Sequence, residues 1–301
     1  MTGGTASVAV PVPFAVTVIG VGNMGGGMAQ RLCALGWAPA VHDVDRSKVE
    51  NLMPFGALAP VDIAQAASKS IASIVCVVDV AQTRDVLFGA NGIAPQLPRG
   101  HVVVLCPTIA PEDVESIAAQ LARQGVDTVD APMSGGPARA RDGSMSLMMA
   151  GSDSVVARVQ PLLDALSIKQ FFIGQSVGDA ARTKLVNNLL AGINLVGAAE
   201  VLALAERLGL DAGNTLDVIE QSSGQSWIGS DRMRRAIASD LAPRAHMTLL
   251  AKDTRLALDA AQAAGFAGPL GAAASAVFAR ALQAGLADLD DAALLGFLKR
   301  P

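Results

Sequence analysis

The first part of the chain alternates between two kinds of hydrophobic pattern. Short, nearly continuous apolar runs predict buried strands, at residues 16–19, 38–44, 71–78, 102–105, 126–130, 146–150 and 171–173. Between several of them, apolar residues recur every three to four positions and predict helices, at residues 24–36, 45–55, 81–88 and 111–124. Strands that are apolar throughout are typical of a parallel sheet covered on both faces, so we predict a doubly wound α/β fold.

Strand signals end at Ala180, and only helical patterns follow. Residues 180–208 predict one long helix ended by Gly209, and further helices are predicted at residues 214–222, 227–238, 246–264, 270–284 and 290–299. We therefore predict three segments: a loose leader at 1–15, an α/β domain at 16–178, and an all-helical domain at 179–301 that a long inter-domain helix joins to the first.

Composition narrows the function classes. The chain has 301 residues, 51% of them hydrophobic, and a net charge of only −4, so neither a nucleic acid nor a membrane is an expected partner. The most apolar long segment, 185–204, could span a bilayer by length, but its three asparagines and one glutamate favour a buried helix. The cysteines show no metal-ligand spacing and predict buried free thiols in a cytoplasmic protein without a metal; they are Cys33, Cys76 and Cys106.

A glycine motif follows the first predicted strand and opens the first predicted helix. In this motif Gly20 permits a tight turn, Gly22 lets a pyrophosphate approach the backbone, and Gly25 lets the helix pack close to the strand. Asn23 and Met24 lie between the last two glycines, at a helix N-terminus that favours phosphate groups. The context of strand, glycines and helix predicts a Rossmann-type dinucleotide site rather than a plain glycine-rich turn.

Asp43 ends the second predicted strand, 18 residues after Gly25. A carboxylate there accepts hydrogen bonds from the ribose hydroxyls of NAD and repels a 2′-phosphate, so we predict NAD as the cofactor. Arg46 keeps NADP open as the alternative, because its side chain has the length to reach back to a 2′-phosphate.

A second glycine pair predicts a site for an anion. Ser134, Gly135 and Gly136 follow the fifth predicted strand and are expected to form a loop. Adjacent glycines let several N–H groups point to one place, and the serine adds a hydroxyl, so this loop is a candidate site for a substrate carboxylate. A surface turn without a ligand is the alternative.

Lys184 and Asn188 open the long helix and share one of its faces, since they are four residues apart. A lysine beside apolar neighbours such as Leu185, Val186, Leu189 and Leu190, which we expect to face the core, is suited to exchange a proton with an alcohol near neutral pH. Asn188 is expected to hold the same substrate oxygen. A solvated surface lysine is the alternative reading.

These motifs together resemble the β-hydroxyacid dehydrogenase family, which includes 3-hydroxyisobutyrate dehydrogenase. The matching segments are residues 20–27, 130–136, 178–188 and the pair Lys252-Asp253. The resemblance implies that Lys184 is the general acid/base and that Lys252 reaches the site shared by cofactor and substrate. Val78 and Thr108, which follow the third and fourth predicted strands, are expected to contact the cofactor. Pro107 departs from the serine that is common in the family before this threonine.

Within the family, residues 223–227, 242–244 and 290–293 resemble the L-threonate dehydrogenase branch. Trp227 is either a substrate contact or a core anchor of the helical domain. The resulting prediction is an NAD-dependent dehydrogenase of a short hydroxy acid, L-threonate first, and a homodimer or homotetramer. The alternatives are 3-hydroxyisobutyrate dehydrogenase, tartronate semialdehyde reductase, an imine reductase, in which an acid or tyrosine replaces the lysine, and a non-catalytic NAD-binding module.

Overall fold

The computed structural model describes residues 13–300, so most of the predicted leader lies outside the described residues. The chain divides into two compact units, the first ending at Lys184 and the second beginning at Leu185. This division falls inside one long helix, and each unit is described separately below.

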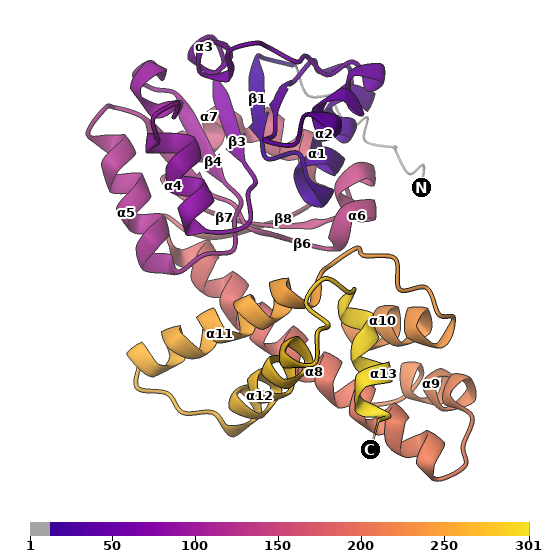
Figure 1. Cartoon of the computed structure of the whole chain (residues 1–301). Helices are drawn as coiled ribbons and strands as arrows, with labels where there is room; N and C mark the ends of the chain where they lie inside the picture. The colour runs from indigo at the N-terminus through magenta and orange to yellow at the C-terminus, as the bar shows by residue number, and fades with distance from the viewer. Residues whose placement is uncertain (1–12, 301) are drawn as a thin grey trace, which may run out of the picture. The chain divides into compact units, whose positions relative to one another are not determined.

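The first unit contains one sheet whose strands were mostly predicted (Figure 1). Its strands are β1 Val16–Ile19, β2 Ala40–His42, β3 Ala72–Val75, β4 Val102–Leu105, β5 Asp127–Asp130, β6 Met133–Ser134, β7 Ser146–Ala150 and β8 Lys169–Gly174. They are ordered β2-β1-β3-β4-β5-β7-β6, and β8 pairs with the other side of β7. Strands β1 to β5 are parallel, so their carboxyl ends share one edge of the sheet.

The prediction of a wholly parallel sheet is wrong beyond β5. Strand β7 runs antiparallel to both β5 and β6, and parallel pairing returns only between β7 and β8. For β6 and β7 the reason is the length of the connection, because parallel neighbours need a crossover of a dozen or more residues. The segment between β6 and β7 is shorter than that, whereas a full helix separates β7 from β8.

Helices cover both faces of this sheet and form two separate cores. They are α1 Asn23–Ala34, α2 Arg46–Glu50, α3 Ile63–Ser68, α4 Val80–Phe88, α5 Pro111–Ala122, α6 Gly136–Asp142 and α7 Asp153–Leu166, with 3₁₀ turns η1 Met53–Phe55 and η2 Ala94–Gln96. Apolar side chains of α1 and α7 pack on one face, and those of α3, α4 and α5 pack on the other. This is the predicted doubly wound arrangement.

Helices α3, α6 and α7 and strand β6 were absent from the sequence prediction. Helix α7 carried a usable signal, because buried residues recur at Val155, Val159, Leu162 and Leu166. Pro161 lies inside this helix and weakens the helical signal of its second half. Strand β6 has only two residues, too few for any periodic pattern.

The second unit is entirely helical in its described part, as predicted. Its helices are α8 Asp179–Arg207, which begins in the first unit, α9 Ala212–Glu220, α10 Trp227–Ile237, α11 Met247–Ala263, α12 Pro269–Gln283 and α13 Leu294–Leu298, with the 3₁₀ turn η3 Asp291–Ala293. Apolar residues from all of these elements meet in one core. It includes Leu195, Leu202, Leu216, Met233, Leu250, Phe278 and Leu294.

Helix α8 is long and apolar enough to cross a membrane by length and composition alone, and 44% of its apolar stretch is buried inside the protein. Leu195, Ala199 and Leu202 face the core of the second unit. The expectation that Val186 and Leu190 also face the core is wrong, since both are exposed. At 100° per residue they lie on the opposite side of the helix from Leu195 and Ala199.

Candidate active site

Two glycines of the first motif are fixed by close backbone approach. Gly20 has a φ of +86°, and a Cβ atom there would lie 2.5 Å from the carbonyl oxygen of Cys76. A Cβ at Gly25 would lie 1.9 Å from the carbonyl oxygen of Gly20. The turn after β1 therefore admits no side chain at either position, as the sequence motif predicted.

Gly22 differs, because no described atom lies within 4 Å of the position its Cβ would take. It is the N-cap of α1 and, as a glycine, has no side chain of its own to cap that end. Open space in front of such a helix N-terminus fits the pyrophosphate of a dinucleotide. Asn23 is exposed at the first turn, whereas the side chain of Met24 packs on the core and so contributes only backbone to this cradle.

A cavity of about 200 Å³ adjoins this turn. It is lined by Val21, Gly22, Asn23, Gly26, Gly27, Gln30, Lys48, Asn51, Leu52 and Arg141. Lys48 and Arg141 give this cavity two cationic groups, and neither residue was predicted from the sequence to bind the cofactor.

Asp43 lies just after β2 and is held to the glycine turn. Its Oδ2 accepts a hydrogen bond from the backbone N–H of Val21 (2.9 Å), and its Oδ1 accepts one from Asp45 N–H (2.9 Å). Lys48 Nζ lies 3.6 Å from Oδ1. Arg46, the residue considered for a 2′-phosphate, instead pairs with Glu50 on the surface. Lys48 therefore lies close to this carboxylate, whereas Arg46 is paired elsewhere.

Val78 and Thr108 follow the carboxyl ends of β3 and β4, on the same edge of the sheet as the glycine turn. Val78 is exposed, Thr108 is half-buried, and Pro107 is buried. Beneath them, burial raises the pKa of the Cys76 thiol to about 12 and that of Cys106 well above its ordinary value. Both thiols are protonated at neutral pH and so are poor nucleophiles.

The three cysteines are free, as predicted, but only Cys106 is fully buried. Cys33 and Cys76 are intermediate in exposure and pack against the core, so the prediction of burial is wrong for Cys33, while burial of the Cys76 thiol still raises its pKa. Cys33 lies near the end of α1 and is only partly packed against the core. Among the described residues, no cluster of acidic, histidine or cysteine side chains has the arrangement of a metal site.

Ser134, Gly135 and Gly136 do not form the predicted loop. Ser134 ends β6, Gly135 caps α6 and Gly136 is its first residue. The two glycines have φ angles of +134° and +76°, conformations that glycine adopts readily and that turn the chain sharply from β6 into α6. A Cβ at Gly27 would lie 3.0 Å from the Cβ of Ala140, so α6 packs tightly on α1. The anion candidate thus lies beside the dinucleotide cradle.

Lys184 and Asn188 are both buried, one helical turn apart on the side of α8 that also carries Leu195. The amide nitrogen Nδ2 of Asn188 donates to Asp253 Oδ2 at 2.6 Å, and its oxygen accepts from Asn187 Nδ2 at 3.0 Å. These bonds orient the amide, and because Nδ2 carries two N–H groups, Asn188 is suited to donate to a substrate oxygen as well.

Asp253 is a further candidate site residue, which the sequence analysis named only as a neighbour of Lys252. It is buried on α11, and its Oδ1 lies 3.0 Å from Lys252 Nζ. The approach of α11 to α8 depends on Gly192, where a Cβ would lie 2.8 Å from Thr254 Oγ1. One carboxylate therefore contacts two of the predicted site residues, Asn188 and Lys252.

Trp227 is the first residue of α10, and 44% of its surface is exposed. This contradicts the core-anchor alternative and leaves the substrate-contact hypothesis. Ser226, which precedes it, is the N-cap of α10, and its hydroxyl accepts from the N–H of Gly229 at 3.1 Å.

The 290–293 segment has a structural role. Arg235 Nη2 lies 3.0 Å from Asp290 Oδ2, and Arg232 Nε lies 2.5 Å from Asp291 Oδ1, so these buried pairs tie α10 to η3. The hydrogen bonds from Arg232 and Arg235 are charge-assisted and hold the C-terminal segment in place.

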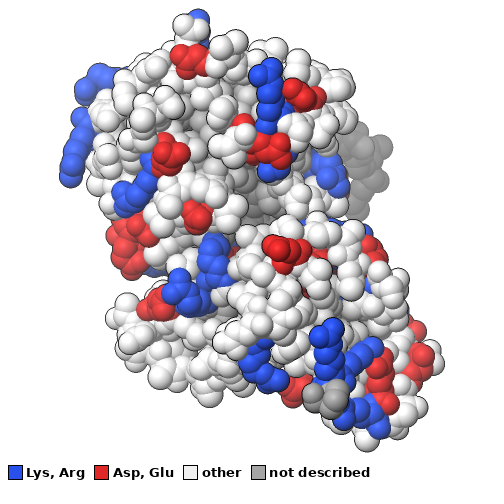
Figure 2. All heavy atoms as spheres, in the orientation of Figure 1, with Lys and Arg blue, Asp and Glu red and all other residues white. Residues whose placement is uncertain are grey.

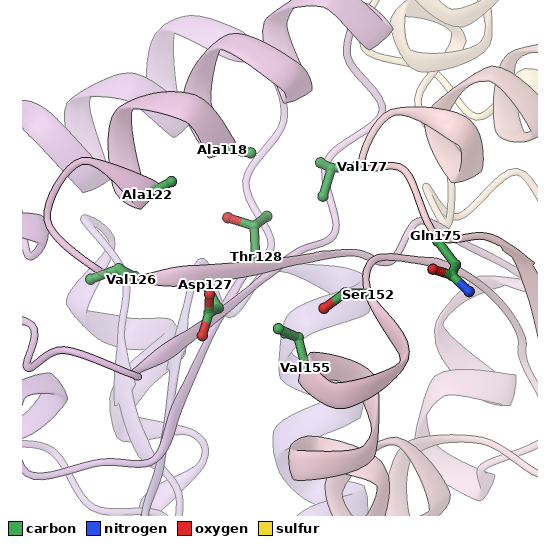
Figure 3. A pocket seen from close by; sticks show the side chains of 9 residues that line it. All are labelled: Ala118, Ala122, Val126, Asp127, Thr128, Ser152, Val155, Gln175 and Val177. Carbon is green, nitrogen blue, oxygen red and sulfur yellow. The ribbon is translucent and has the colours of Figure 1, made fainter.

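Another cavity, of about 250 Å³, lies between α5, the start of β5, the start of α7 and the segment after β8 (Figure 3). It is lined by Ala118, Ala122, Val126, Asp127, Thr128, Ser152, Val155, Gln175 and Val177. None of the predicted site residues lines it, so it is separate from the candidate active site.

Two family models match the chain. Residues 15–174 match the NAD-binding domain of 6-phosphogluconate dehydrogenase. Residues 178–298 match the model described as the NAD-binding part of NADP-dependent 3-hydroxyisobutyrate dehydrogenase. The two matches together cover nearly all of the described chain.

Individual proteins are similar over the same length. The L-threonate dehydrogenase of Escherichia coli (strain K12) is 35% identical over 283 residues, 94% of this chain and 94% of that protein. The 3-hydroxyisobutyrate dehydrogenase of Pseudomonas aeruginosa is 33% identical over 277 residues, 89% of this chain and 92% of that protein. A crystal structure of a 3-hydroxyisobutyrate dehydrogenase from Salmonella typhimurium has a TM-score of 0.89 and 33% identity, and the match covers 94% of this chain and 99% of that one.

Proposed function

Because the chain belongs to the β-hydroxyacid dehydrogenase family and is an NAD(P)-binding oxidoreductase of hydroxyl groups, we propose that it oxidises L-threonate with NAD. The observation that supports this most is the pair Lys184 and Asn188. Both are buried on one side of α8, and a bond from Asn188 to Asp253 orients the amide. A non-catalytic binding module has no use for such a pair.

In the proposed mechanism, each residue has one task. Ser134, Gly135 and Gly136 bind the substrate carboxylate through a hydroxyl and backbone N–H groups. Asn188 donates an N–H to the reacting oxygen, and Lys184 accepts the hydroxyl proton as the general base. The nicotinamide ring of a bound dinucleotide supplies the hydride acceptor.

We propose that the residues around the glycine turn hold that dinucleotide. The open cradle at Gly22 fits the pyrophosphate, and Asp43, held by Val21 N–H, is placed to accept from the adenosine ribose. Val78, Thr108 and Lys252 are proposed to contact the cofactor nearer the nicotinamide. The carboxylate of Asp43 favours NAD, while Lys48 beside it is the residue that would support NADP.

The choice of L-threonate rests on the relatives and on polarity. Relatives with that name reach 35% identity, and the segment before α10 is polar, with Ser223 and Gln225 exposed and Trp227 beside them. The alternatives 3-hydroxyisobutyrate and tartronate semialdehyde would use the same lysine and the same anion site.

We further propose a cytoplasmic location and a small anionic substrate. Lysine, arginine and acidic side chains are interspersed on the face shown in Figure 2, a distribution that suits a small-molecule enzyme.

A substrate panel tests this proposal directly. The purified protein is assayed with L-threonate, 3-hydroxyisobutyrate and glycerate, each with NAD and with NADP, by the absorbance of the reduced nicotinamide. We expect the highest kcat/KM for L-threonate with NAD, because a site that hydrogen-bonds extra hydroxyls discriminates strongly against analogues that lack them. Equal or better turnover of 3-hydroxyisobutyrate would contradict the substrate. A preference for NADP would contradict the cofactor, and K48A would then be the variant to compare.

A further inference from the structure

We infer that Asp130 is a positioning residue for Lys184: its buried carboxylate caps the first turn of α8 and thereby fixes the position of the proposed catalytic lysine. This inference rests on the proposed function, since it concerns the same lysine. Asp130 acts through the helix, by its hydrogen bonds to the backbone at the start of α8.

The contacts are direct. Asp130 ends β5 and is 1% exposed. Its Oδ2 accepts hydrogen bonds from the backbone N–H groups of Gly178 (3.0 Å) and Ala181 (2.9 Å). Gly178 has a φ of +103°, a conformation that glycine adopts readily and that brings the chain round to this carboxylate just before the helix.

These N–H groups lie at a helix end where the backbone has no partners within the helix. A carboxylate at that end satisfies the donors and also interacts favourably with the helix dipole. Lys184 follows Ala181 by three residues, less than one turn. A shift in the first turn is therefore passed to the lysine almost undiminished.

The same carboxylate connects the two halves of the proposed chemistry. Asp130 precedes Ser134 by four residues, and only the short link to β6 separates them. Asp130 thus anchors the helix of the general base to the strand that leads into the carboxylate site. Displacement of a reacting group by about 1 Å can cost 10²-fold in rate.

The titratable neighbours of the Asp130 carboxylate are an acid and a thiol. Asp179 on α8 faces it with like charge, and the Cys106 thiol after β4 is its titratable neighbour. Burial raises the pKa of Asp130 to about 6, against the hydrogen bonds from α8 that lower it. Below that pH the group becomes a neutral acid and binds the helix end more weakly.

The test compares D130N and D130A with the wild-type enzyme, and D127A is the matched control. Asp127 lies at the other end of β5 and pairs with Arg158, so its loss removes a carboxylate from the same strand without touching α8. We expect D130A to lose about 10²-fold in kcat. We expect D130N to lose about tenfold, because an amide oxygen still accepts the N–H bonds without the charge. KM for the dinucleotide should change by less than about threefold in each case, since the glycine turn is intact.

The pH profile separates positioning from mere folding. The ratio of wild-type to D130N kcat should fall from about ten at pH 8 toward one at pH 5, because the wild-type group is then protonated. Burial favours the protonated form, so the charged form costs folding free energy above pH 6, and D130N should melt no lower than wild type at pH 8. A constant ratio across pH, or retention of more than half of kcat by both variants, would overturn the inference.

Hydrogen exchange gives a readout that does not depend on activity. Amides of residues 178–184 should exchange faster in D130A than in wild type or D127A. If wild-type protein oxidises no hydroxy acid of the panel, the proposed function fails, but hydrogen exchange still tests whether Asp130 caps α8. Unchanged exchange in D130A would overturn the cap itself.

Discussion

At the scale of single residues, the proposed chemistry depends most on Lys184. K184A should lower kcat by about 10²–10⁴-fold, the usual contribution of a general acid or base, while the dissociation constant for NAD stays within about threefold. The measurement is steady-state turnover together with calorimetric titration of the cofactor.

A control for this change lies two residues earlier on the same helix. Arg182 is half-exposed and pairs with Glu115 and Asp179, so R182A removes a cation from α8 at the cost of surface ion pairs only. We expect R182A to keep most of its activity. If K184A retains more than about a third of wild-type kcat, the lysine does not transfer the proton.

At the scale of elements, the turn between β1 and α1 separates two kinds of glycine. At Gly25 a Cβ would lie 1.9 Å from the carbonyl of Gly20, whereas at Gly22 it would meet no described atom within 4 Å. G25A should therefore lower the melting temperature by about 5–10 °C, because the helix must move away from the strand. G22A should melt within about 2 °C of wild type and raise KM for the dinucleotide by about tenfold, since its methyl group occupies the cradle.

Each variant is the control for the other, because both add one methyl group to the same turn. Thermal melting and cofactor titration on the two proteins decide the outcome. A stable G25A, or a G22A that binds NAD as wild type does, would show that the turn is not the tight, ligand-facing structure described here.

At the scale of the whole molecule, α8 leaves an apolar stripe uncovered. The exposed residues Val186, Leu190, Val201 and Leu204 fall within about 60° of one another around the helix at 100° per residue. Gly197 lies in the same stripe, and a Cβ there would meet no described atom within 4 Å. A continuous apolar stripe with a small residue at its centre is suited to close packing against another helix.

We propose that a second copy of the chain covers this stripe and that the protein is a homodimer or a dimer of dimers. Sedimentation velocity should show a dimer or tetramer for the wild type, and L204E should dissociate it, because a charge in a packed interface is costly. V218E is the matched control: Val218 is also exposed but lies on α9, and its substitution should leave the assembly intact. A monomeric wild type would refute the proposal.

The sequence determined those features that depend on spacing along a short stretch of chain. The three glycines at the first turn, the aspartate after the second strand and the pair Lys184 and Asn188 were identified because covalent geometry fixes what residues two to four apart can do. The strand and helix boundaries around them follow from patterns of similar length. The family was identified for the same reason, since its motifs are local and ordered along the chain.

Only the tertiary structure decided how distant segments meet. Asn188 bonds to Asp253 across 65 residues, and Asp130 caps α8 across 48 residues, and no local pattern encodes either pairing. Helix α8 is apolar on nearly all sides, so its sequence did not reveal that Lys184 is buried while Val186 is exposed. The antiparallel β7 and the two-residue β6 likewise depend on neighbouring strands. Spacing sets what a segment can form, but packing between segments sets which of its faces is buried and which partner each polar group finds.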